Sequence, residues 1–203
     1  MMQFTIKRKN YQMVDPPNIN NAQNLSGISF ASKVGRNHSS SVISPPAETK
    51  DKKVMTWGEP TWFLFHTLSE KVKEDAFPII RKELLDKFYS ICKFLPCPTC
   101  AEHATEYLNG INFNAIRTKD DLKTLFFNFH NEINKKKGYP IFSYSDLDDK
   151  YSKANTVAIL HYFMSHFEKK SKSIRMIAND FHRSNLVLSL KEWFNKNIHY
   201  FDP

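Results

Sequence analysis

Two of the three cysteines lie in a short segment whose residue types suit redox or metal chemistry. They are three positions apart, with a histidine one helical turn later, in the run Cys97-Pro98-Thr99-Cys100-Ala101-Glu102-His103. A dithiol pair at this spacing can close a small disulfide, and a helix N-terminus favours the thiolate form that exchanges disulfides. Thiolate and imidazole are also the usual ligands of zinc, so the same residues could begin a zinc site. The segment alone leaves both kinds of chemistry open.

Four stretches with helical spacing of apolar residues surround the cysteine pair. The stretch before it contains Phe77, Ile80, Leu84, Phe88, Ile91 and Leu95, and the stretch after it contains Leu122, Leu125, Phe126, Phe129 and Ile133. An earlier stretch has Trp62, Phe65, Leu68 and Val72, and one that starts at the cysteines has Ala101, Ala104, Tyr107 and Leu108. The Asn109-Gly110 pair is predicted to end that last helix. Short connections between four such helices predict an all-α bundle.

Three separated motifs occur in a fixed order along the chain. They are Trp57-Gly58 followed by Trp62 and His66, the segment Cys97 to His103, and His130-Asn131-Glu132-Ile133-Asn134 closing at Gly138 and Pro140. In this order they resemble the Erv/ALR family of FAD-linked sulfhydryl oxidases, over roughly Val54 to Tyr151. The resemblance implies a four-helix bundle that holds FAD in its core beside the cysteine pair. It also implies a short fifth helix that caps the site.

The resemblance assigns a role to each motif residue. Cys100 would be the thiol nearest the flavin and would pass electrons to it, while Cys97 would form and resolve a mixed disulfide with the substrate thiol. Gly58 has no Cβ and would let the backbone approach the cofactor closely, and Trp62 offers an aromatic face for stacking. Lys136 would serve the nucleotide phosphates. The implied FAD-binding residues are Gly58, Trp62, His66, Cys100, His103, His130, Asn131, Asn134 and Lys136.

Some positions depart from the family pattern. Glu59 stands where many members have a basic or neutral residue, and Tyr139 where some carry a lysine. Cys92 is the remaining cysteine, so no second shuttle pair can form within the chain. We expect electrons to come directly from a partner dithiol or from a separate small CxxC redox protein. Cys92 falls on the apolar stripe of its helix and is predicted to be a buried free cysteine, although a covalent link between two copies stays open.

The implied activity is oxidation of protein dithiols. Electrons would run from the substrate through the Cys97 and Cys100 pair and FAD to O2, releasing H2O2, in a protein that pairs as a homodimer through its first helices. The minimal core and the abundance of Lys, Asn, Ile and Phe resemble the enzymes of large cytoplasmic DNA viruses. On that interpretation the protein would act on virion proteins in the host cytoplasm or the virion, where glutathione opposes disulfides.

The composition divides the chain into three expected parts. Residues 1–52 are rich in Asn, Ser, Pro and Lys without periodicity and are predicted to form a flexible arm. Residues 53–151 form the oxidase domain, and residues 152–203 form a helical C-terminal extension, with helical spacing from Tyr151 to Phe167 and from Leu186 to Phe194. We expect neither a signal peptide nor a membrane span, because no apolar run is long enough.

Two other functions are alternatives. One is suggested by the net charge of the chain, and the other by the same cysteine and histidine residues. The net charge of +8 and the isoelectric point near 9.3 would suit a nucleic-acid-binding or virion structural protein. No recognition motif accompanies the basic clusters Lys50–Lys53, Lys135–Lys137 and Lys169–Arg175, so nucleic acid is the less favoured partner. A zinc site would use Cys97, Cys100, His103 and His130, whereas the preferred interpretation needs no metal. Four histidines of the predicted C-terminal extension match no motif and are expected to be structural, namely His161, His166, His182 and His199.

Overall fold

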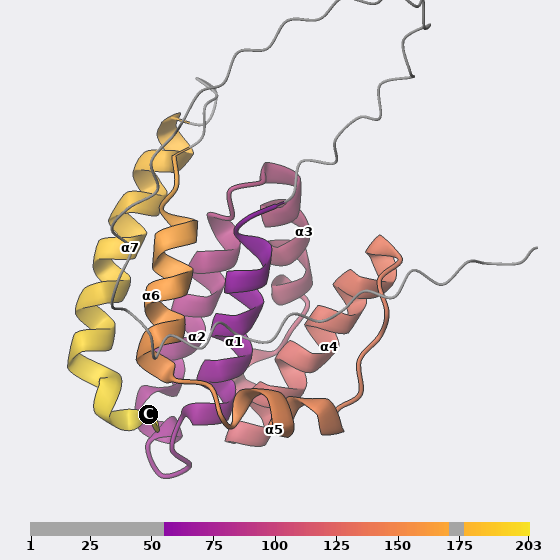
Figure 1. Cartoon of the computed structure of the whole chain (residues 1–203), viewed down its shortest axis with the longest axis vertical. Helices are drawn as coiled ribbons and strands as arrows, with labels where there is room; N and C mark the ends of the chain where they lie inside the picture. The colour runs from indigo at the N-terminus through magenta and orange to yellow at the C-terminus, as the bar shows by residue number, and fades with distance from the viewer. Residues whose placement is uncertain (1–54, 171–176) are drawn as a thin grey trace, which may run out of the picture. The chain divides into compact units, whose positions relative to one another are not determined.

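The protein, seen here in a computed structural model, is described over residues 55–170 and 177–203, and the predicted arm of residues 1–52 lies outside them. Within these ranges the chain forms helices joined by short connections (Figure 1). The predicted all-α fold is confirmed. The helices are α1 (Gly58–Lys71), α2 (Phe77–Lys93), α3 (Pro98–Asn109), α4 (Lys119–Lys137), α5 (Ser145–Tyr151), α6 (Thr156–Phe167) and α7 (Ile177–Asn197), with short 3-10 turns at Phe113–Ala115 and Ile198–Tyr200.

Three phenylalanines join the bundle helices at the centre of the core. The ring centroid of Phe65 on α1 lies 5.0 Å from that of Phe88 on α2 and 4.8 Å from that of Phe126 on α4. Phe88 and Phe126 are 4.6 Å apart, and all three side chains are fully buried. Tyr107 on α3 stacks on Phe129 on α4 at 4.5 Å. The apolar stripes predicted from periodicity therefore meet in one core, and aromatic pairs supply much of its contact area.

The helix ends are fixed by local signals in the sequence. Helix α3 begins at the cysteine pair, as predicted, and Cys97 is its N-cap. Thr118 and Asp121 form a capping box at the start of α4. Gly138 ends α4 in the left-handed conformation, with φ of 68°, a backbone region open to glycine at no steric cost. Gly110 ends α3 at the predicted place, but with φ of −76°, so its end uses no left-handed residue.

A buried lysine connects three helices on the side of α5. The Nζ atom of Lys123 on α4 lies 2.7 Å from a carboxylate oxygen of Glu70 on α1 and 2.5 Å from one of Asp148 on α5. Burial alone would lower the pKa of Lys123, but its hydrogen bonds to Asp148 and Glu70 raise the pKa overall. The side chain of Glu70 is only 16% exposed. Lys123 is therefore the cation that compensates a largely buried carboxylate.

We predict that Lys123→Met lowers the free energy of unfolding by about 2 kcal/mol, because it leaves the carboxylate of Glu70 buried without a cation. The control is Lys82→Met, which breaks the exposed Lys82–Asp86 pair on α2 and should have a much smaller effect, because solvent screens an exposed pair. Urea unfolding of both variants measures the difference. Equal losses in the two variants would contradict the role given to Lys123.

The C-terminal extension is helical, as predicted, but its helix boundaries differ from those that the periodicity predicts. Tyr151 ends α5, and α6 begins only at Thr156, so the predicted single stretch from Tyr151 to Phe167 is wrong. The break occurs because Asn155 caps α6, its side chain accepting a hydrogen bond from the backbone N–H of Ala158. Helix α6 packs against α1. The domain boundary after residue 151 stays a prediction.

Helix α7 lies antiparallel to α2. Three pairs of side chains join the two helices, with residue numbers rising along α2 as they fall along α7: Glu83 accepts from Trp193, Lys87 donates to Ser189, and the ring of Phe94 stacks on His182. The chain then returns to α1, where Phe201 pairs with Val72 in an isolated β-bridge. None of the described helices is long and apolar enough to cross a lipid bilayer.

Candidate functional site

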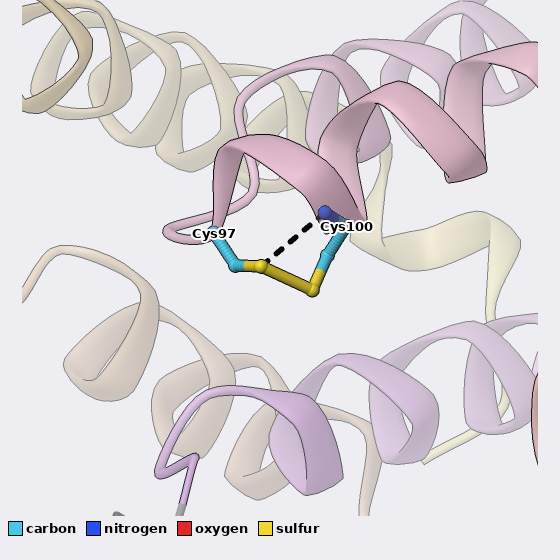
Figure 2. Close-up of a disulfide and its surroundings, with 2 residues drawn as sticks. All are labelled: Cys97 and Cys100. Carbon is cyan, nitrogen blue, oxygen red and sulfur yellow. Dashed lines mark hydrogen bonds between the residues drawn. A yellow bond between two sulfur atoms is a disulfide. The ribbon is translucent and has the colours of Figure 1, made fainter. Parts of the chain in front are cut away.

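Cys97 and Cys100 form a disulfide at the start of α3, with their Cα atoms 5.2 Å apart (Figure 2). The backbone N–H of Cys100 donates a hydrogen bond to the Sγ atom of Cys97 at 3.2 Å, drawn as the dashed line in Figure 2. Both cysteines are half-buried. A disulfide that solvent reaches at a helix N-terminus is open to exchange, because thiolates released there are stabilised by the helix dipole.

An inner cavity of about 90 Å³ lies beside Cys100. Cys100 contributes to its wall, whereas Cys97 does not. The other walls come from α1, α2, α3 and α4, and the lining is mainly apolar, with Gly58, Trp62, Cys92, Phe129 and Ile133 among its residues. The two cysteines therefore differ in surroundings, since Cys100 lines the interior of the bundle and Cys97 does not.

An outer groove of about 590 Å³ lies between α3 and α4 and shares His103 with the inner cavity. Its lining is polar and charged, and includes Tyr107, Asn131, Lys135 and Lys136. Its volume is within the range of about 300–1,000 Å³ that is usual for ligand pockets, whereas the inner cavity is smaller. Together the two spaces offer an apolar end beside the disulfide and an outer end whose charged residues are both acidic, Glu106 and Glu132, and basic, Lys135 and Lys136.

Four aromatic and imidazole rings form a connected cluster of stacked and hydrogen-bonded rings, and one of them, Trp62, also lines the inner cavity. The indole of Trp62 lies parallel to the ring of His130, with centroids 4.0 Å apart and planes at 7°. The Nδ1 atom of His130 is 2.9 Å from Nε2 of His66, a hydrogen bond that joins α4 to α1. Tyr151 at the end of α5 stacks on His66 at 4.9 Å. Trp62, His66 and His130 come from separate sequence motifs and lie together in one cluster.

Both histidines of this cluster are held neutral. Burial, followed by the charges of His130 and Lys150, lowers the pKa of His66 well below its usual value. Burial, followed by the charges of Lys150 and Lys137, lowers the pKa of His130 from 6.5 to about 3. A neutral pair lets one imidazole donate and the other accept, which suits the short contact between them.

We predict that the protein loses stability as the pH falls from 7 to 5. In the unfolded chain His130 gains a proton below its ordinary pKa of 6.5, whereas in the folded chain it stays neutral, so acid favours unfolding. At pH 5 this proton alone accounts for a loss of up to about 2 kcal/mol. His130→Gln, which keeps a hydrogen-bonding partner for His66, should show a correspondingly smaller pH dependence in urea unfolding. An unchanged dependence would contradict the neutral pair.

The remaining predicted residues lie around the outer groove or behind it. Asn131 holds the segment after α4, because its amide donates to the carbonyl oxygen of Phe142 and accepts from its N–H. Lys136 is exposed on the groove, 3.8 Å from Glu132. Asn134 is buried and lines neither space. Their roles towards a cofactor stay predictions.

The structure shows the burial of Cys92 and the placement of the residues considered for a zinc site. Cys92 is 1% exposed and takes part in no disulfide in the described part of the chain, as expected for a structural cysteine. Burial raises the pKa of its thiol. Among residues 55–170 and 177–203, no group of three or more His, Cys, Asp or Glu is placed to hold a metal ion. Cys97, Cys100, His103 and His130, considered from sequence as a zinc site, do not form such a group within these ranges.

The structure adds residues that the motifs did not identify. Lys137 lines the inner cavity, and burial lowers its pKa. Phe129, Ile133 and Lys137 recur every four residues and therefore share one face of α4, so helical spacing could have revealed this lysine. Tyr151 joins the ring stack through a contact between α1 and α5 that no local pattern encodes.

Comparison with known proteins points to one family. Residues 59–152 match the model of the Erv1/Alr family. The fowlpox virus protein FPV093 is 33% identical over 73 residues, covering 36% of this chain and 69% of that protein. A sulfhydryl oxidase of African swine fever virus is 26% identical over 106 residues, covering 51% of this chain and 88% of that protein.

A third relative is the 096R protein of invertebrate iridescent virus 3, which is 25% identical over 96 residues. The match covers 47% of this chain and 65% of that protein, slightly less than two thirds of its length. The fowlpox and iridescent virus proteins carry provisional names as FAD-linked sulfhydryl oxidases, and the African swine fever virus protein carries that name without qualification. No solved structure gives a significant match.

Proposed function

The chain belongs to the Erv1/Alr family, and on that premise we propose that it is an FAD-linked sulfhydryl oxidase that forms disulfides in protein substrates. The observation that carries the proposal is the disulfide between Cys97 and Cys100, with Cys100 on the wall of the inner cavity. This arrangement gives the pair access to a substrate on one side and to a buried acceptor on the other.

The residues present fit a flavin dinucleotide in chemistry. No atom lies within 4 Å of the position that a Cβ on Gly58 would take, so the space beside this backbone is open. Trp62 and Phe129 supply aromatic walls for a planar ring system. Lys135 and Lys136 on the outer groove and Lys137 on the inner cavity supply cations for a diphosphate. We propose that these residues hold FAD, together with His66, His103, His130, Asn131 and Asn134.

The chain's own chemistry begins with thiol exchange at Cys97. A substrate thiolate attacks the Sγ atom of Cys97, the bond between Cys97 and Cys100 breaks, and Cys100 leaves as a thiolate. The second thiolate of the substrate then attacks the substrate sulfur of the mixed disulfide and releases Cys97. The substrate is oxidised by two electrons, and the cysteine pair is reduced by two.

The reduced pair of Cys97 and Cys100 then holds the two electrons, and its Cys100 sulfur lies beside the inner cavity. FAD bound there would supply the redox chemistry that returns the pair to the disulfide, passing the electrons to O2 with release of H2O2. The backbone N–H of Cys100 that reaches Cys97 is a fixed donor which stabilises negative charge on that sulfur during exchange. The apolar walls from Phe129 and Ile133 limit the access of water to this point.

The partners in this proposal are dithiol proteins, or a small CxxC protein that relays electrons from them, and O2. The viral relatives support an origin in a large DNA virus, with action in the host cytoplasm or the virion. A homodimer is also part of the proposal. Helix α1 offers little surface for a contact between two copies, because all its residues from Pro60 to Ser69 except Trp62 are buried within this chain.

Oxygen consumption tests the proposed activity. Purified protein supplied with FAD should consume O2 and release H2O2 when a dithiol such as dithiothreitol or a reduced protein is added, in the ratio of one O2 per disulfide formed. Disulfide formation without O2 uptake, or no disulfide formation at all, would contradict the proposal.

A further inference from the structure

A row of exposed apolar side chains runs along α7. Ile177, Phe181 and Leu188 are 62%, 64% and 56% exposed, and their spacing of four and seven residues puts them on one face of the helix. We call these three residues the α7 apolar stripe. Other α7 side chains pack into the bundle core, among them Val187 and Leu190, which are fully buried. The stripe therefore has no part in the packing that holds α7 in place.

One end of the stripe lies at the end of the bundle that carries the disulfide. Phe94 precedes Cys97 by three residues, and its ring stacks on His182 with centroids 5.3 Å apart. His182 is the chain neighbour of Phe181. Because α7 runs antiparallel to α2, the first turn of α7 lies at the end of α2 from which the chain continues through Phe94 to Cys97. Phe181 and Ile177 are thus the exposed apolar residues of α7 closest to the redox pair.

The size of the stripe suits a brief encounter. Three side chains at this exposure present roughly 300–400 Å² of surface, less than half of the roughly 800 Å² that each partner gives to a stable interface. A second copy bound through the stripe alone would therefore not be held firmly. A substrate of an oxidase has to leave once its disulfide is made, so a small apolar contact at the same end of the bundle as the redox pair is sufficient for it.

We propose that the α7 apolar stripe is the docking surface for polypeptide substrates, which place an apolar side chain against Phe181 and Ile177 while their cysteine pair reaches Cys97. The inference rests on the proposed function and adds a substrate class to it, namely dithiol polypeptides with an apolar residue near the cysteines. Exposed Lys93, whose Nζ atom is 5.7 Å from the ring centroid of Phe94, adds a positive charge that attracts the attacking thiolate.

Steady-state kinetics with paired peptides test this proposal. One series of reduced peptides carries a Cys-X-X-Cys pair with Phe at one of the four positions before the first cysteine, and the matched series carries Ser there. With the unaltered protein, the best Phe peptide should have a kcat/KM about tenfold above that of its Ser counterpart. Phe181→Ser should remove most of this preference, and Ile177→Ser part of it, while kcat/KM for dithiothreitol stays within about twofold of its original value.

The matched control is Ile79→Ser, which removes an apolar side chain of similar exposure, 69%, near the start of α2. It should leave the peptide preference intact. A preference that survives in Phe181→Ser would overturn the proposal, as would an equal loss with dithiothreitol and peptides. A change of molecular mass in Phe181→Ser would place a second copy on the stripe instead. If the unaltered protein oxidises neither dithiothreitol nor peptides, the proposed function itself is wrong, and this inference falls with it.

Discussion

Cys100→Ser should lower the turnover of dithiothreitol by at least about a thousandfold, because the variant has no disulfide with which a substrate thiolate can exchange. The substitution exchanges sulfur for oxygen and leaves the walls of the inner cavity in place, so FAD binding should be retained. Oxygen consumption gives the turnover, and the ratio of flavin to protein absorbance gives the occupancy. The combination of lost turnover with retained flavin separates a redox role from a structural one.

Thr99→Ala is the matched control for this variant. Thr99 lies between the two cysteines and is exposed at the first turn of α3, so the substitution alters the same turn without removing a sulfur. Turnover should stay within about threefold of the original value. Oxygen consumption that continues unchanged in Cys100→Ser would show that electrons take another route, and the role proposed for the pair would then be wrong.

Trp62→Ala should weaken FAD binding about a hundredfold, because it removes an aromatic wall of the inner cavity and leaves a void in its place. The indole also supports the ring of His130 at 4.0 Å, so its loss frees that imidazole and, through it, His66. Titration of the apoprotein with FAD, followed by the quenching of flavin fluorescence, measures the dissociation constant.

The conservative variant Trp62→Phe separates stacking from simple packing. It keeps an aromatic face at this position and should bind FAD within about tenfold of the original affinity. Trp62→Leu keeps apolar bulk without an aromatic face and should fall near the alanine variant. Equal affinities in the Phe and Leu variants would contradict a stacking role for Trp62, whatever their effect on stability.

Helical periodicity and cap residues predicted most of the fold, because both act over one or two turns of chain. The stripes of α1 to α4 lie in the core as expected, and Gly138 ends α4 where the motif closes. The break between α5 and α6 was missed because a single capping residue, Asn155, outweighs apolar spacing that continues across it. The β-bridge from Phe201 to Val72 joins residues far apart in sequence, and no local pattern encodes it.

The structure brings together some of the residues predicted for the candidate site, while their roles towards a cofactor stay predictions. Trp62, His66 and His130 lie together because these residues occupy helix faces that point into one bundle. The direct hydrogen bond between the two histidines depends on how α1 and α4 are set against each other, which spacing along one helix does not determine. The same holds for the contact of Tyr151 with His66 and for the position of α7 beside α2.

The positions of the basic residues bear on the alternative function of nucleic-acid binding. Of the three basic clusters noted in the sequence, Lys135–Lys137 lies wholly within the described residues, and its members line the two spaces of the candidate site. This placement supports a role in binding a diphosphate at the candidate site. It gives no support to a flat cationic surface of the kind that binds a nucleic acid backbone.

The measurement that tests the central claim most directly is the visible absorption spectrum of the purified protein after incubation with FAD and removal of the excess. The account predicts a flavin band that bleaches when dithiothreitol is added in air-limited solution and returns when air is admitted. A protein that retains no flavin, or whose flavin band is unaffected by the dithiol, would contradict the assignment of Cys97, Cys100 and the adjoining cavity to a sulfhydryl oxidase.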